Sequence, residues 1–224
     1  QVRHLAEHVG QTDVQVAGGL VTRDPDLRAK FLLWTRQPYA GVSDPRENPV
    51  GVYPRRQENG ALIGRYEVRL EEGALAHHRR LQEGEQPSDN ATLWYAYLET
   101  AAANPWFNDQ AYVDALSRPA IERFIQSTHD AYARIVGDYF GTVVPAIFTD
   151  EPQFICGQSF ESVQDQQDVG IGFTSDFFET YAQTYDQRLE EHLPELFWEL
   201  PQGRASVARY RYHEHISERF ASAY

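Results

Sequence analysis

The chain has 224 residues, of which 42% are hydrophobic and 13% aromatic, a composition typical of a globular protein. Its formal net charge of -13 at pH 7 argues against a nucleic-acid partner, because binding to phosphates depends on a surplus of Lys and Arg. No stretch approaches the roughly 20 consecutive apolar residues of a membrane span, so we expect no membrane partner. An acidic chain rich in aromatic residues fits a neutral substrate such as a sugar.

The compartment is only weakly constrained by the sequence. Cys156 is the only cysteine, so no disulfide can form within the chain. The triplet Asn90-Ala91-Thr92 would accept a glycan in a secreted protein, which favours an extracellular location. The sequence has no methionine, not even at position 1, and we therefore expect it to be a piece of a longer protein.

Residues 1–36 are predicted to be a first segment of the main domain. Gln1–Gly10 is predicted to be the remnant of a helix, because the segment ends at a glycine. Asp24-Pro25-Asp26 is typical of a helix start, and the apolar run Phe31–Trp34 predicts a strand.

Residues 37–90 are predicted to form a loop and a small β insertion. Prolines and glycines crowd between Gln37 and Gly60, which indicates a long surface loop. Apolar and polar residues then alternate over Ala61–Leu70, as in a half-exposed antiparallel strand, and Ala74–Leu81 is its expected partner.

Residues 91–224 are predicted to hold the core of the main domain. A strand over Thr92–Leu98, a helix over about Ser117–Val136 and a strand over Val143–Phe148 make a βαβ pattern. Two further helices are expected over about Thr174–Leu193 and Arg204–Tyr224. Because parallel strands alternate with helices in this pattern, we expect an α/β fold, part of a (β/α)8 TIM-type barrel.

The strongest functional signal follows the predicted strand Val143–Phe148. This apolar run suggests a strand buried on both faces, and it ends in Thr149-Asp150-Glu151-Pro152. Catalytic groups of α/β barrels lie at the carboxyl ends of the strands. We therefore expect Glu151 to transfer a proton at a glycosidic oxygen, with Asp150 raising its pKa or binding a sugar hydroxyl. The alternative is a strand-end ion pair or a cap.

A second group of polar and aromatic residues follows the strand Thr92–Leu98. Sugar sites combine aromatic platforms with amides and acids that bind hydroxyls. Asn104, Trp106, Asn108 and Glu99 offer these groups and would lie on the same barrel rim as Glu151. The alternative is a turn closed by Asn-Pro with a packed tryptophan.

A zinc site is a further alternative. His4-Leu5-Ala6-Glu7-His8 matches the pattern H-x-x-E-H, in which two histidines on one helix face bind zinc beside a glutamate base. The pattern is loose and has no downstream ligand that we can assign. A solvated helix face is the simpler interpretation.

Several motifs in the second half of the chain resemble the central barrel of large glycoside hydrolases related to the α-L-rhamnosidases. These motifs are Asn104-Pro105-Trp106-Phe107-Asn108, Tyr112-Val113-Asp114, Thr128-His129-Asp130-Ala131-Tyr132, Tyr139-Phe140-Gly141 and Ile147-Phe148-Thr149-Asp150-Glu151-Pro152. The resemblance implies a (β/α)8 barrel, hydrolysis of a glycosidic bond and often a calcium ion near the sugar. Barrel glycosidases with Asn-Glu-Pro at the fourth strand use that Glu as acid/base, and this chain has Asp150 in place of the Asn.

The sequence therefore predicts a glycoside hydrolase acting on a plant- or microbe-derived glycan, with Glu151 as general acid/base. A glycosidase needs a second carboxylate, which is either Glu99 or a residue outside this chain. The rival predictions are a carbohydrate-binding barrel without catalysis and a zinc-dependent hydrolase that uses His4 and His8.

Overall fold

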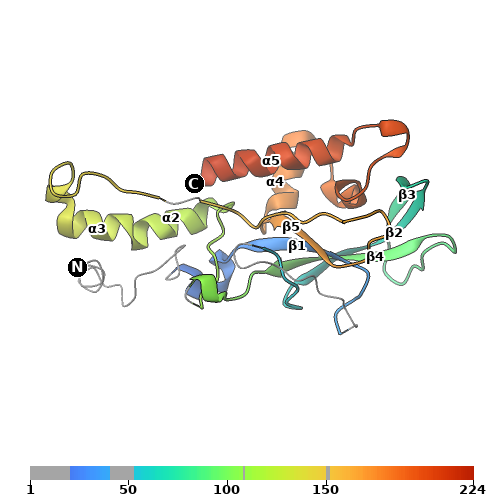
Figure 1. Cartoon of the computed structure of the whole chain (residues 1–224), viewed down its shortest axis with the longest axis horizontal. Helices are drawn as coiled ribbons and strands as arrows, with labels where there is room; N and C mark the ends of the chain where they lie inside the picture. The colour runs from blue at the N-terminus through green and yellow to red at the C-terminus, as the bar shows by residue number, and fades with distance from the viewer. Residues whose placement is uncertain (1–20, 41–52, 108, 150–151) are drawn as a thin grey trace.

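The computed structural model describes residues 21–40, 53–107, 109–149 and 152–224. In this part of the chain the strands form one five-stranded sheet with the order β3-β2-β4-β1-β5 (Figure 1). The strands are β1 (Lys30–Thr35), β2 (Ala61–Glu71), β3 (Ala74–Leu81), β4 (Thr92–Thr100) and β5 (Val169–Phe173). Each neighbouring pair is antiparallel.

The antiparallel pairing contradicts the expected partial (β/α)8 TIM-type barrel, in which parallel strands alternate with helices. The strands predicted over Phe31–Trp34 and Thr92–Leu98 are confirmed as β1 and β4, but they run in opposite directions. The predicted hairpin is also confirmed, since β2 pairs with β3 across the turn at Glu72 and Gly73. Because β2 also pairs with β4, this hairpin belongs to the same sheet as β1.

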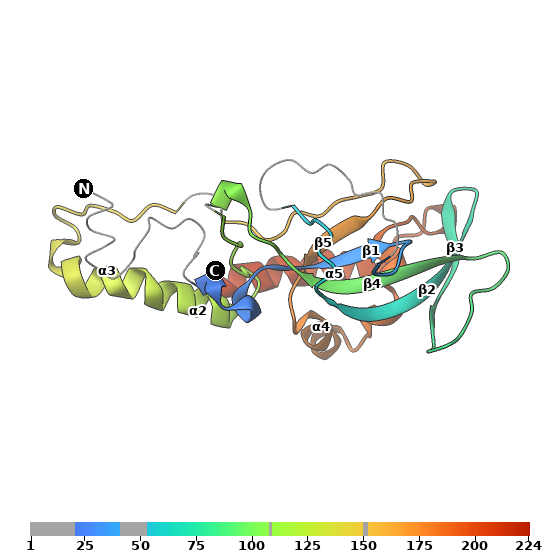
Figure 2. The same cartoon turned by 90° about the horizontal axis from the view of Figure 1, so that it is seen from below.

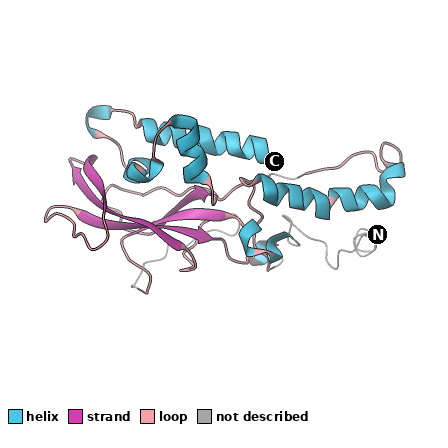
Figure 3. Ribbon diagram, turned by 180° about the vertical axis from the view of Figure 1, so that it is seen from behind, coloured by secondary structure: helices cyan, strands magenta, loops and turns pink. Residues whose placement is uncertain are grey.

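The α-helices flank the sheet on one face and extend beyond one of its ends (Figures 1 and 2). The α-helices are α2 (Arg118–Ser127), α3 (His129–Val136), α4 (Phe177–Tyr185) and α5 (Val207–Ala223). The 3-10 helices are η1 (Val21–Arg23), η2 (Pro25–Leu27), η3 (Pro105–Phe107), η4 (Gly137–Tyr139), η5 (Leu189–Glu191), η6 (Leu193–Leu196) and η7 (Pro201–Gly203). Helices α4 and α5 cover the sheet, whereas α2 and α3 project away from it (Figure 3).

The main core lies between the sheet and the helices α4 and α5. Three tryptophans meet there: Trp34 stacks on Trp94 at 5.8 Å between ring centroids, and Trp198 meets Trp94 edge-on at 5.2 Å. Phe177 and Tyr212 contribute from the helices. Aromatic pairs of this kind add about 0.5–1.5 kcal/mol beyond the area they bury.

Strand β1 is buried on both faces, because a second apolar cluster covers the side of the sheet away from α4 and α5. Phe31 and Leu33 point into this cluster together with Tyr97 of β4. Phe107 of η3 and Ile155, which lies in a loop, complete this cluster. The apolar run Phe31–Trp34, which predicted a strand, thus reflects burial from both sides within an antiparallel sheet.

The predicted strand Val143–Phe148 is wrong. The described residues of this segment form no strand, and the side chains of Val143, Ile147 and Phe148 are 77%, 61% and 84% exposed. An apolar run indicates a tendency to be buried, but it carries no information about which strand would pair with it. Consequently the expected βαβ unit does not form.

The predicted helix over Ser117–Val136 is divided into α2 and α3 at Thr128. The Thr128 hydroxyl donates a hydrogen bond to the carbonyl oxygen of Phe124, and its backbone has φ -114° and ψ -75°. Threonine hydroxyls that bond back to the preceding turn often bend helices. The helix start predicted at Asp24 is confirmed, because its carboxylate accepts a hydrogen bond from the backbone N–H of Asp26 at 3.0 Å.

Two other expectations fall on residues that are not described. The predicted helix Gln1–Gly10, with the H-x-x-E-H pattern that it carries, lies outside the described residues. Among the described helices, no segment is long and apolar enough to cross a membrane.

Candidate functional site

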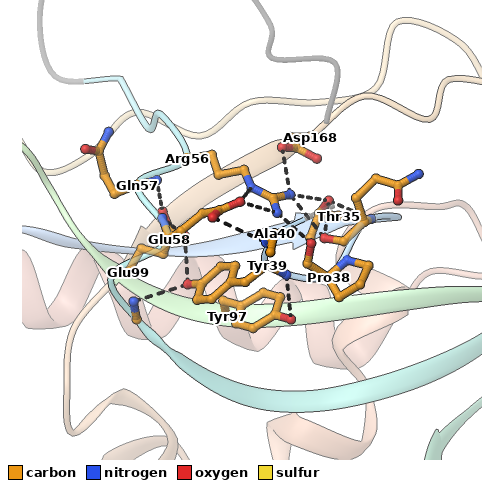
Figure 4. Close-up of polar contacts among 12 residues, drawn as sticks. Thr35, Pro38, Tyr39, Ala40, Arg56, Gln57, Glu58, Tyr97, Glu99 and Asp168 are labelled. Atoms are coloured by element: carbon orange, nitrogen blue, oxygen red, sulfur yellow. Dashed lines mark hydrogen bonds and ion pairs between the residues drawn. The ribbon is translucent and has the colours of Figure 1, made fainter. Parts of the chain in front are cut away.

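Glu99 is the predicted site carboxylate that lies within the described part of the chain. It lies on β4 opposite Phe31 of β1, and its side chain is fully buried. Its carboxylate accepts hydrogen bonds from the Tyr39 hydroxyl at 2.8 Å and from the backbone N–H groups of Gln57 and Glu58 at 2.6 and 3.0 Å (Figure 4). Burial raises the pKa of Glu99 and outweighs these hydrogen bonds, which favour the ionised form. Glu99 thus fastens the segment around Gln57 to the sheet.

Arg56, which precedes Gln57 in this segment, binds it to neighbouring parts of the chain (Figure 4). Its guanidinium donates to the Glu58 carboxylate and to the carbonyl oxygen of Pro38, both at 2.8 Å, and it lies 3.5 Å from the Asp168 carboxylate. It also lies over the ring of Tyr39, 5.6 Å from the centroid. The hydrogen bond from Arg56 lowers the pKa of Glu58. The charge of Arg56 is therefore largely matched by carboxylates of the protein itself.

A pocket of about 350 Å³ opens beside this anchored segment. Aromatic rings form part of its wall, and arginine and amide side chains form the rest of its polar lining. The lining residues that carry these groups are Phe31, Tyr53, Phe107, Tyr112, Arg55, Arg56, Gln57 and Asn104. The described lining contains no Asp or Glu. Such a mixture of apolar walls with a few polar groups is typical of small-molecule sites.

Asn104 is the predicted sugar-binding residue that the structure places at the pocket. Its backbone oxygen accepts hydrogen bonds from the N–H groups of Phe107 at 2.9 Å and of Asp109 at 3.1 Å, which close the turn. The backbone forms a turn at Asn104-Pro105, as the alternative interpretation of this segment expected, and the turn continues into η3, which contains Trp106. Asn104 and Glu99 lie near the same segment, because Gln57 lines the pocket and also bonds Glu99.

Asn108, Asp150 and Glu151 lie outside the described residues. The described residues that follow Glu151 in the chain do contact the pocket. The backbone N–H of Gln153 donates to the Tyr112 hydroxyl at 3.2 Å, and Ile155, which is 2% exposed, lines the pocket wall. Tyr112 is itself a lining residue, and burial raises its pKa.

Sequence reasoning missed the arginines of the pocket. Tyr53, Arg55, Arg56 and Gln57 lie in the stretch that the prolines and glycines marked as a surface loop. Arg55 is exposed, and within the described part of the chain its guanidinium has no ion-pair partner. Two adjacent arginines in a chain with a net charge of -13 were the signal available in the sequence.

Comparisons with known proteins give this chain no relative. No protein-family model matches it, and neither the curated proteins nor the solved structures contain a significant match.

Proposed function

We propose that this chain binds a carbohydrate in the pocket beside Asn104 and hydrolyses a glycosidic bond there, with Glu151 as general acid/base. The observation that carries the proposal is the composition of the pocket, together with the contact that Gln153 and Ile155 make with it. These residues follow Glu151 and Pro152 directly in the chain.

The pocket offers the contacts that a sugar ring needs. Tyr53, Phe107 and Tyr112 supply aromatic surface for the apolar face of a pyranose, while Asn104 and Arg55 supply polar groups for its hydroxyls. A volume of about 350 Å³ lies at the lower end of the range for ligand sites, about 300–1,000 Å³, and suits one sugar unit better than a long chain. The sugar class that the sequence resemblance suggests is α-L-rhamnoside.

The catalytic part of the proposal rests on the sequence Thr149-Asp150-Glu151-Pro152 and on the resemblance to glycoside hydrolases. Glu151 would donate a proton to the leaving oxygen, and a neighbouring Asp150 would favour its protonated form. We do not assign the second carboxylate to Glu99, because that side chain is fully buried and bonds three groups of the protein.

Carbohydrate binding without catalysis is the second candidate. It is favoured by one observation: the described lining of the pocket holds arginines and amides but no carboxylate. In that case Asn104 and the aromatic rings would hold the sugar, and Glu151 would have no part in the function.

The experiment compares the wild-type chain with Glu151→Gln and Asn104→Ala on a panel of aryl glycosides that includes α-L-rhamnoside. Glu179→Gln, an exposed carboxylate on α4, is the matched control. If Glu151 transfers a proton, Glu151→Gln should lower kcat by about 10²–10⁴-fold while the control keeps full activity. Sugar binding should be retained in Glu151→Gln and weakened in Asn104→Ala, as measured by calorimetry.

The outcomes separate the two candidates. Sugar binding that depends on Asn104, without turnover by the wild type, would favour the binding protein. Turnover that survives Glu151→Gln would remove Glu151 from the chemistry. If neither binding nor turnover responds to Asn104→Ala, the pocket is not the sugar site.

A further inference from the structure

Two histidines and a glutamate meet on the side of the sheet that faces away from the sugar pocket. His78 lies on β3, paired with Val68 of β2. His192 is the N-cap residue of η6, and Glu195 lies within η6. Residues three apart eclipse one another in a 3-10 helix, so the two side chains project from the same side of η6 towards β3. The loop between α4 and α5 and the edge strand of the sheet are joined at this point.

The three side chains converge on one carboxylate oxygen. His192 Nδ1 lies 2.8 Å and His78 Nε2 3.3 Å from Glu195 Oε1. One candidate ligand atom from each residue lies within 4.8 Å of the other two. The side chains of His78 and Glu195 are 18% and 13% exposed, and that of His192 is 34% exposed, so the cluster has one side open to solvent.

The second oxygen of Glu195 is held independently. The Ser206 hydroxyl donates to Glu195 Oε2 at 2.6 Å, and Ser206 is fixed in turn as the N-cap of α5. Arg209 donates to the backbone oxygen of Glu195 at 2.8 Å. These contacts hold the Glu195 carboxylate in a fixed orientation, as outer-sphere partners hold the ligands of a metal site.

We infer that His78, His192 and Glu195 form a binding site for a zinc ion. Two imidazoles and one carboxylate are a known zinc ligand set, with a fourth position left for water. With metal–ligand bonds of about 2.0–2.2 Å, tetrahedral geometry places ligand atoms about 3.3–3.6 Å apart. The two histidine nitrogens lie 2.8 and 3.3 Å from Glu195 Oε1, and one ligand atom of each of the three residues lies within 4.8 Å of the other two. Side-chain movements of about 1 Å would therefore bring the three atoms to the tetrahedral spacing.

The chemistry of the ligands excludes calcium. Imidazole suits zinc, copper and nickel, whereas calcium takes six to eight oxygen ligands, which this cluster lacks. The bound ion would link β3 to the segment that precedes α5. A backbone hydrogen bond already joins these two parts, because the N–H of Leu75 on β3 donates to the carbonyl oxygen of Glu199 at 2.8 Å. This site uses neither His4 nor His8 as a ligand, and it does not depend on the proposed glycosidase activity.

The test is a Zn²⁺ titration of the chelator-treated chain by calorimetry, with Co²⁺ absorption spectra as a second readout of tetrahedral nitrogen–oxygen coordination. We expect His78→Ala and Glu195→Gln to weaken Zn²⁺ binding at least tenfold. His77→Ala is the matched control, because His77 is the neighbouring residue on β3 and bonds Glu67 instead. The double variant His4→Ala/His8→Ala should bind Zn²⁺ like the wild type, and excess Ca²⁺ should not compete.

The proposal fails if the wild type binds no Zn²⁺ in stoichiometric amount, whether or not the variants fold. It also fails if His4→Ala/His8→Ala abolishes binding, or if folded His78→Ala, checked by circular dichroism, binds as tightly as His77→Ala. In those cases the cluster is a hydrogen-bonded clamp between β3 and η6.

Discussion

Gly170 on β5 provides a sharp test of how the pocket segment is held on the sheet. A Cβ atom at this position would lie 2.3 Å from the Cβ and 2.5 Å from the Cγ of Pro54, and 3.3 Å from Phe31 Cδ2. Ordinary contact begins at 3.4 Å, so Gly170→Ala must push Pro54 outwards by about 1 Å (3.4 minus 2.3). Pro54 directly precedes Arg55 and Arg56 of the pocket.

The magnitude follows from two opposing effects. Overpacking a buried position costs about 1–3 kcal/mol, whereas Gly→Ala recovers about 0.4–1 kcal/mol by restricting the unfolded chain. We therefore expect Gly170→Ala to lower the free energy of unfolding by about 1–2 kcal/mol. In a chain of this size that corresponds to a Tm lower by about 2–8 °C.

The assay is urea unfolding followed by tryptophan fluorescence, with Gly157→Ala as the control. A Cβ at Gly157 would meet only the Ile171 Cγ2, at 3.9 Å, so this variant should stay within about 0.5 kcal/mol of the wild type. Equal stability of Gly170→Ala and Gly157→Ala would refute the packing of Pro54 on β5. Because the pocket edge moves with Pro54, Gly170→Ala should also weaken ligand binding.

Three further predictions concern single side chains. Glu99→Leu should cost several kcal/mol in urea unfolding, because it leaves the N–H groups of Gln57 and Glu58 without their acceptor, at about 1–3 kcal/mol each; an unchanged midpoint would contradict the anchoring role. Burial opposes ionisation of Glu67, but hydrogen bonds from Ser88, His77 and Arg79 lower its pKa to about 2. Its contribution to stability is therefore full above the ordinary pKa of 4.5 and is lost as the pH falls towards 2. The free energy of unfolding, measured at several pH values, should show this loss, and in Glu67→Gln it should depend less on pH. An equal pH dependence in the wild type and in Glu67→Gln would rule out this role of Glu67. Phe148→Ser should change the free energy of unfolding by less than about 0.5 kcal/mol, because Phe148 is 84% exposed. A loss of several kcal/mol in the same assay would indicate instead that Phe148 is buried, as the predicted strand required.

The candidate site could be predicted from the sequence only in part. Asn104 was identified because an amide beside aromatic residues is a common feature of sugar sites, and the structure places it at the pocket. Glu99 was identified as a carboxylate after a strand, but the sequence carried no sign that Tyr39 and the loop at Gln57 would bury it. His78 and Glu195 could not be paired at all, because they are distant in sequence and meet only through the packing of η6 on β3.

Local patterns in the sequence determined where most strands and helices form. Alternation defined the hairpin of β2 and β3, the apolar run at Phe31 defined β1, and Asp24 with Pro25 marked a helix start. These features depend on neighbours a few residues away, so a linear pattern contains them. Tertiary structure alone decided that β1 and β4 run antiparallel and that Val143–Phe148 pairs with no described strand. Strand direction and partner depend on side chains brought from distant parts of the chain, which the local pattern of any one segment does not contain.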